Sequence, residues 1–201
     1  MSLSENQLNL DISGWREGIS HVEYPCYYWD NLLSPKKCDE IIKLGERNRC
    51  IKGKIISANK EDTSIRNSFI SWIRPADSLD LYETIWAAVQ MQPWGYDIRG
   101  FADTMQYTVY EGDYNHFYNW HTDTGPKQQH RKVSFTLQLS DPQEYEGGVF
   151  ELDGPRGSFP ILPKGKGSAF IFPSFLRHRV TPVTKGVRKS LVTWIGGPKL
   201  K

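Results

Sequence analysis

The chain has 201 residues, of which 38% are hydrophobic and 24% are charged, and its formal net charge at pH 7 is +2. This length and composition are typical of one globular domain and argue against an intrinsically disordered chain. Because the basic residues are scattered and no apolar run approaches the ~18 residues that a membrane span needs, we expect neither a nucleic-acid partner nor a membrane segment.

The N-terminal segment, MSLSENQLNL, lacks the charged start and apolar core of a secretory signal. The first twenty residues are polar and weakly patterned, which favours an arm or an initial strand. Three cysteines, Cys26, Cys38 and Cys50, form no Cys-x-x-Cys motif, and one would stay unpaired in any disulfide scheme. We therefore expect free buried thiols and a cytoplasmic location.

Two segments of the first half have helical patterns. The first follows Ser34, a good N-cap residue, and has Pro35 at the first helical position. The second covers residues 78–92, where apolar residues recur at helical spacing. Between these helices, the polar residues 53–67 indicate a mobile loop or hairpin, and residues 68–73 indicate a strand.

After Gly95 the pattern changes to short β-type runs separated by turn-rich text. Strands at this spacing predict an α+β, mainly β fold, in which helices pack on one side of a β sandwich or barrel. We expect a single domain over residues 1–201, with a helix-bearing half at about 1–100 and a β core at about 101–197. The runs are 104–110, 131–140, 147–152, 168–172, 177–183 and 188–195.

The candidate chemistry lies in YNWHTDTG, residues 118–125. His121 and Asp123 are two residues apart, so in an extended segment both side chains point to the same face. His178 begins a later β run and can supply a third ligand. Two imidazoles and one carboxylate leave coordination positions open, which suits non-haem iron(II) in oxygenases.

A second signal is Arg188, which opens the apolar run RKSLVTWIGG. A guanidinium that faces a core is costly unless it meets an anion in a fixed geometry. A dicarboxylic co-substrate would provide that anion, and Ser190 on the same strand face could donate a hydrogen bond to it. The alternative is a charge that points outward from an edge strand.

Together these segments resemble the iron(II)/2-oxoglutarate dioxygenase superfamily, within it the prolyl 4-hydroxylase-like branch. YEGDYNHFYNWHTDT resembles the segment that carries the first two metal ligands, and RKVSFTLQLSDPQEYEGGVFEL resembles the two following strands. GSAFIFPSFLRHRVTPVTKGVRKSLVTWIGG resembles the segment with the distal histidine and the carboxylate-binding arginine. The collagen-type enzymes usually have lysine at the position of Arg188, so the chain is more similar to intracellular and bacterial members.

The resemblance implies a double-stranded β-helix (jelly-roll) core with the site between its two sheets. It implies Fe(II), 2-oxoglutarate and O2, with ascorbate as a candidate reductant, and His121, Asp123 and His178 as metal ligands. Arg188 would bind the far carboxylate of 2-oxoglutarate, which is decarboxylated to succinate while a C–H bond is hydroxylated. Further pocket or co-substrate positions that the resemblance suggests are Tyr110, Ser190, Gln138, Thr136, Trp194 and Tyr118.

Each of these secondary positions could equally be core packing, and Tyr107 is a weaker rival to Tyr110. We interpret His21, His116 and His130 as surface or structural residues, since none has an acidic partner at ligand spacing.

The favoured substrate is a prolyl residue of a peptide or protein. The alternatives are a free amino acid or other small molecule, and a cupin-like metalloprotein that is not an oxygenase. The sequence does not define the oligomeric state.

Overall fold

The computed structural model describes residues 25–48, 51–52, 64–154, 157–161 and 165–199. Its helices are α1 (Pro35–Arg47) and α2 (Leu79–Val89), with 3-10 turns at Pro75–Asp77, Gly112–Tyr114 and Pro142–Glu144. Its strands are β1 (Tyr27–Trp29), β2 (Ile51–Lys52), β3 (Arg66–Asn67), β4 (Phe69–Ile73), β5 (Gly100–Phe101), β6 (Met105–Glu111), β7 (Phe117–His121), β8 (Arg131–Gln138), β9 (Tyr145–Gly147), β10 (Phe150–Gly154), β11 (Gly157–Pro160), β12 (Ala169–Pro173), β13 (His178–Val180) and β14 (Val183–Gly196).

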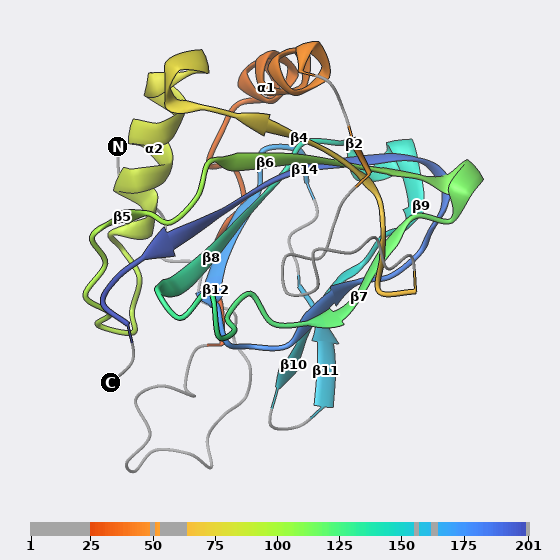
Figure 1. The fold of residues 1–201 in the computed structure, drawn as a ribbon. Coiled ribbons are helices and arrows are strands. Elements are labelled where there is room, and N and C mark those ends of the chain that lie inside the picture. Colours follow the sequence, from red (N-terminus) through yellow and green to blue (C-terminus); the bar gives the residue numbers. More distant parts are fainter. Residues whose placement is uncertain (1–24, 49–50, 53–63, 155–156, 162–164, 200–201) are drawn as a thin grey trace.

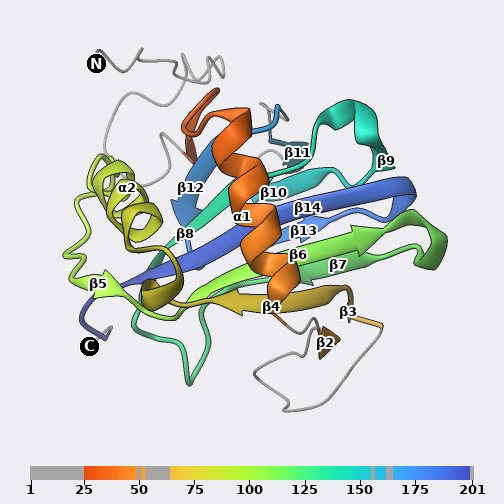
Figure 2. The same ribbon diagram turned by 90° about the horizontal axis from the view of Figure 1, so that it is seen from above.

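The strands form two antiparallel sheets. The larger has nine strands in the order β1-β12-β8-β14-β6-β4-β2, with β5 and β9 also paired to β14. The smaller has five strands in the order β11-β10-β13-β7-β3. Figure 1 shows the smaller sheet beneath the larger one, and Figure 2 shows α1 crossing the outer face of the larger sheet. This mainly β architecture is that of a jelly roll.

Alternation along the central strands gives the larger sheet two different faces. Tyr107, Leu137 and Leu191 belong to a hydrophobic cluster that also contains Ile41 of α1 and Ile85 of α2. The contact with α1 is close, because a Cβ added at Gly45 would lie 2.3 Å from the ring of Tyr107. The intervening residues of the same strands face the smaller sheet, and this is the space in which the site lies.

Most predicted elements are confirmed. Ser34 caps α1, and its Oγ accepts a hydrogen bond from the Lys37 amide at 3.2 Å. The second helix and the strand predicted over residues 68–73 correspond to α2 and β4. Cys26 and Cys38 are free and buried. The first twenty residues, His21, Cys50 and residues 53–63 of the predicted loop lie outside the described residues.

The structure corrects several boundaries. The run 147–152 was predicted as one strand, but Gly147 and Gly148 have φ of +75° and +57°, so they turn the chain between β9 and β10. The run 177–183 is likewise divided between β13 and the start of β14. The text around Gly157 was predicted as a turn, but it contributes β11, which pairs with β10. In the described part of the chain, neither helix has the length and hydrophobicity required to cross a bilayer.

Candidate metal centre

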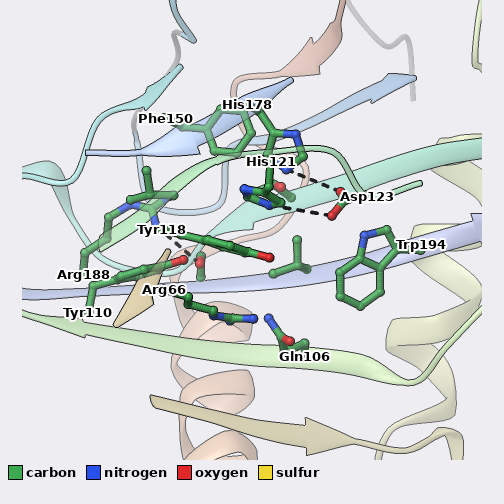
Figure 3. Close-up of a pocket in the computed structure, with 14 residues that line it drawn as sticks. Arg66, Gln106, Tyr110, Tyr118, His121, Asp123, Phe150, His178, Arg188 and Trp194 are labelled. Carbon is green, nitrogen blue, oxygen red and sulfur yellow. Dashed lines mark hydrogen bonds and ion pairs between the residues drawn. The ribbon is translucent and has the colours of Figure 1, made fainter. Parts of the chain in front are cut away.

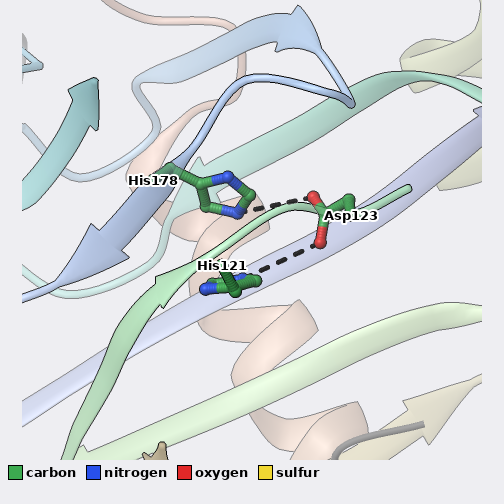
Figure 4. A group of neighbouring side chains, drawn as sticks. All are labelled: His121, Asp123 and His178. Atoms are coloured by element: carbon green, nitrogen blue, oxygen red, sulfur yellow. Dashed lines mark ion pairs between the residues drawn. The ribbon is translucent and has the colours of Figure 1, made fainter. Parts of the chain in front are cut away.

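Strands β7 and β13 and the segment that follows β7 bring His121, Asp123 and His178 together. His121 ends β7 and His178 begins β13, and these two residues are direct partners in the antiparallel pairing of the strands. Asp123 lies two residues beyond the end of β7, so it is not part of the extended strand that the sequence suggested. Its carboxylate nevertheless points to the same place, and the three ligand atoms lie within 4.8 Å of one another (Figure 4).

The geometry directs one nitrogen of each imidazole to this point. His121 Nε2 lies 3.8 Å from Asp123 Oδ1, and His178 Nε2 lies 3.5 Å from Asp123 Oδ2. The Nδ1 atoms lie 2.7 Å from the Asn119 carbonyl and 2.9 Å from the Leu176 carbonyl. A carbonyl only accepts, so each Nδ1 donates and each Nε2 is left with a lone pair. This donor set fits an octahedral ion with open positions.

Asp123 is held by groups that the sequence analysis did not identify. Ser134 Oγ donates to Asp123 Oδ2 at 2.6 Å and also contacts Ser174 Oγ at 3.0 Å. Arg131 Nη1 donates to the Asp123 carbonyl at 3.3 Å, and its guanidinium lies 3.8 Å above the ring of Trp194. Such outer groups fix the orientation of a metal ligand. None of them carries a motif, because their roles depend on positions fixed only by the fold.

The electrostatics favour a neutral imidazole and an ionised carboxylate. Burial, together with the neighbouring His178, lowers the pKa of His121 to about 3. Burial alone would raise the pKa of Asp123, but His178, His121 and the hydrogen bond from Ser134 outweigh it, so this pKa is lowered. Both shifts favour the forms that bind a metal ion.

A small inner cavity of about 40 Å³ adjoins the three ligands, and Tyr110, Arg188 and Trp194 line it (Figure 3). Arg188 is 1% exposed. Its Nη2 donates to Gln138 Oε1 at 2.9 Å, and its Nη1 lies 3.5 Å from Ser190 Oγ. No carboxylate of the described residues forms an ion pair with it. In the part of the chain that the structure describes, this buried charge therefore lacks a counter-ion.

The structure places the other predicted pocket residues around the same cavity. Thr136, Ser190 and Tyr118 line it, and Gln138 reaches it through Arg188. Tyr118 stacks on His121 with ring centroids 3.5 Å apart. Tyr107 is instead in the cluster under the helices, on the opposite face from Tyr110. Their roles in binding stay predictions.

Several donors that line the inner cavity have no partner. Among the described residues, the buried side-chain atoms without a hydrogen bond include Arg66 Nη2, Thr136 Oγ1, Arg188 Nε and Trp194 Nε1. All four residues line this one cavity. Since buried donors are rarely left unsatisfied, their concentration indicates that a polar ligand belongs here.

Arg66 was missed by the sequence analysis, which placed it in a loop. It lies on β3, is 6% exposed, and its guanidinium lies 4.6 Å from the centre of the Tyr118 ring. The usable signal was the one that identified Arg188, an arginine at the start of an apolar run, here RNSFISWI. His116 and His130 do not belong to the ligand group; His116 Nδ1 accepts from the Glu111 amide at 3.0 Å, which is a structural role.

Comparison with known proteins agrees with this site. Residues 105–196 match the model of the 2OG-Fe(II) oxygenase superfamily. A PKHD-type hydroxylase of Azoarcus sp. (strain BH72) is 32% identical over 173 residues, which are 79% of this chain and 72% of the relative. Matches to some further PKHD-type hydroxylases span less than half of those chains.

Two solved structures share the fold. A Pseudomonas putida prolyl-4-hydroxylase aligns with a TM-score of 0.68 and 20% identity, over 86% of this chain and 93% of that one. A prolyl hydroxylase from Trichoplax adhaerens, in complex with a hypoxia-inducible factor peptide fragment, aligns with a TM-score of 0.72 and 19% identity, over 86% and 83%.

The family uses Fe(II), 2-oxoglutarate and O2, and the group of His121, Asp123 and His178 is consistent with binding of the iron. The family contradicts the alternative of a cupin-like protein without oxygenase activity. The chain belongs to the 2OG-Fe(II) oxygenase superfamily and is a 2-oxoglutarate-dependent oxygenase that is similar to PKHD-type hydroxylases and shares its fold with prolyl hydroxylases.

Proposed function

We propose that this protein hydroxylates a C–H bond of a prolyl residue in a peptide or protein and converts 2-oxoglutarate to succinate and carbon dioxide. The observation that carries the co-substrate assignment is Arg188. Its guanidinium is buried beside the ligand group without an anionic partner among the described side chains. A dicarboxylate whose other end binds the metal would supply that anion.

His121, Asp123 and His178 would hold the iron. Bound iron would supply the activation of dioxygen that lets an unactivated C–H bond be oxidised. Arg188 would then fix the far carboxylate of the co-substrate, with Ser190 Oγ beside it at 3.5 Å from Nη1. The ring of Tyr110, 5.4 Å from the Arg188 guanidinium, forms the adjacent wall. Thr136 and Trp194 offer donors to the bound co-substrate or to water.

The prolyl substrate is supported by similarity. The relatives include PKHD-type hydroxylases, and two proteins with the same fold are prolyl hydroxylases, one of them in complex with a peptide fragment. An outer cleft of about 480 Å³ also adjoins the site, which is large enough for part of a peptide.

The first experiment tests the co-substrate. Fe(II) and then 2-oxoglutarate are added to the purified protein without oxygen, and the visible spectrum is recorded. We expect a weak metal-to-keto-acid charge-transfer band that is absent in His121→Ala. In Arg188→Ala, iron should still bind but the band should need roughly 100-fold more 2-oxoglutarate, because two charge-assisted hydrogen bonds are lost. Unchanged affinity in Arg188→Ala would overturn the assignment.

The second experiment tests the substrate. Prolyl peptides are incubated with the complete system, and each product is examined for the mass of one added oxygen atom. A gain of this mass on proline supports the proposal. A panel with no such gain, under conditions in which succinate forms with another substrate, contradicts it.

A further inference from the structure

The outer cleft leads from the surface to the metal ligands. Ile70 and Trp72 of β4, Gln106 of β6 and Trp194 of β14 line one side of it, and Tyr118 lies opposite. It shares Arg66, Gln106 and Tyr118 with the inner cavity. Arg188 lines the inner cavity but not this cleft, so a substrate in the cleft would approach the metal ligands past Arg66 and not past Arg188.

The charged residues that line this cleft differ in whether they have a partner of opposite charge. Asp123 is a metal ligand, and Arg131 is neutralised by Asp103, whose Oδ2 lies 3.0 Å from Nε. Arg66 lines the cleft without such a partner: in the described ranges, no carboxylate lies within ion-pair distance of it. Its Nε donates to Ser68 Oγ at 2.9 Å, and its buried Nη2 has no acceptor. Within the described ranges, the cleft thus keeps one positive charge that no carboxylate pairs with.

The neighbouring groups do not compensate this charge. The Tyr118 ring, 4.6 Å from the guanidinium, gives a cation–π contact, but an aromatic ring carries no net negative charge. Ser68 is a neutral acceptor. An ionised partner forms shorter hydrogen bonds than a neutral one, about twice as strong, and also removes the cost of a buried charge. A peptide carbonyl would satisfy Nη2 but would leave that charge in place.

The position of Arg66 relates this missing anion to the reaction. Figure 3 shows Tyr118 between His121 and Arg66, with the Arg66 guanidinium directed towards Gln106. The Tyr118 ring contacts both Arg66 and the metal ligand His121, so an anion bound to Arg66 would be separated from the metal ligands by this one ring. The rest of that wall, with Ile70, Trp72 and Trp194, is apolar and suits a saturated ring.

We propose that Arg66 binds a carboxylate of the substrate, so that the preferred substrate is a prolyl compound with a free carboxylate. Within the proposed function, the source is a C-terminal prolyl residue of a peptide; N-acylated proline and proline itself carry the same carboxylate and serve as probes. Arg188 then binds the carboxylate of the co-substrate, and Arg66 binds the carboxylate of the substrate. This inference rests on the proposed function.

The test uses matched acids and amides with the full chain, loaded with Fe(II) and 2-oxoglutarate without oxygen. The probes are N-acetyl-L-proline, Gly-Gly-Pro and L-proline, each compared with its C-terminal amide. Binding is measured by the change that a substrate causes in the charge-transfer band, so no turnover is needed. We expect at least one acid to bind tenfold or more tightly than its amide, and the tightest acid identifies the source.

The variant Arg66→Gln keeps a hydrogen-bond donor but removes the charge. It should abolish the preference for the acid and leave the affinity for 2-oxoglutarate unchanged, while Arg66→Lys should retain part of the preference. Arg177→Gln is the matched control, since Arg177 contacts Trp120 at the rim but is paired with Asp153 at 3.3 Å. It should behave as the wild type.

Three results would overturn the inference: acids and amides that bind alike, no acid that binds, or an Arg66→Gln variant whose 2-oxoglutarate affinity falls as in Arg188→Ala. Failure of the proposed function is distinguishable from these results, because either the charge-transfer band would be missing from the wild type or the amides as well as the acids would leave it unchanged.

Discussion

The two faces of the larger sheet are built from alternate residues of the same strands and have opposite compositions. On the face under the helices, β8 presents Phe135 and Leu137 to a hydrophobic cluster. On the other face it presents Ser134, Thr136 and Gln138, which are equally buried but polar. Burial is therefore not what distinguishes core from site. The site is the face on which several unsatisfied buried donors, among them Thr136 Oγ1 and Arg188 Nε, line one cavity that a ligand can fill.

The sharpest test of this difference removes a ligand from the polar face. Asp123→Ala should lose Fe(II) binding, because two imidazoles remain and the anionic ligand is gone. Ser134→Ala, which removes the hydrogen bond to Asp123, should weaken iron binding by about 10- to 100-fold. Equilibrium dialysis with metal analysis measures both. Asp153→Asn, an acid paired with Arg177, should bind iron normally, and a loss there would contradict the assignment.

The two faces can also be compared at neighbouring positions. Leu137→Ala should lower the free energy of unfolding by about 2–5 kcal/mol but leave 2-oxoglutarate affinity unchanged in the folded fraction. Thr136→Val should have unchanged or higher stability, because its buried hydroxyl has no partner, and severalfold weaker 2-oxoglutarate binding. Chemical denaturation and the charge-transfer titration measure these effects. The reverse pattern would disprove the division between the faces.

A smaller effect is expected from the turn that faces Arg188. A Cβ on Gly148 would lie 2.8 Å from Arg188 Cδ, so Gly148→Ala should displace this side chain and weaken 2-oxoglutarate binding roughly tenfold, with iron affinity unchanged. Gly95→Ala is a matched control, since Gly95 has a similar φ of +67° but nothing within 4 Å of an added Cβ. Equal losses of affinity in both variants would mean that backbone strain alone is responsible.

The smallest effect concerns His116, which lies outside both faces of the site. Burial and the nearby Lys52 lower the pKa of His116, so the folded chain takes up this proton at a lower pH than the unfolded chain, in which a histidine has a pKa of about 6.5. Stability should therefore fall as the pH falls below about 6.5. Metal-free His116→Gln should lose less stability between pH 7.5 and 5.5 than metal-free wild type. Equal losses would show that His116 does not contribute.

The sequence was informative where functional residues form a recognisable motif or interrupt a regular apolar pattern. His121, Asp123 and His178 could be proposed as ligands because residue types and order alone suggested them, and Arg188 because a charge opens an apolar run. Ser134 and Arg131, which hold Asp123, could not be found in this way, since their contacts arise only when β8 pairs with its neighbours.

The shortest elements were also beyond sequence reasoning. Strands β2, β3 and β5 have two residues each, too few for any alternation to be recognised. Arg66 was missed for this reason, because β3 exists through its pairing with Tyr118 and Phe117 of β7 and not through its own propensity. The strand predicted over residues 147–152 began too early, although the Gly147–Gly148 pair is itself a turn signal, because glycine readily adopts a positive φ.

The length of β14 has a consequence for how the protein reaches its native state. This strand pairs with β5, β6, β8 and β9, and it carries Arg188, Ser190 and Trp194 at intervals of two and four residues. If β14 paired with its neighbours one residue out of register, these three side chains would point into the hydrophobic cluster under the helices. Leu191 and Ile195 would then point towards the metal site. Chains with that error would be both unstable and inactive. Amide hydrogen exchange should therefore be slowest along β14, whose exchange should require global unfolding.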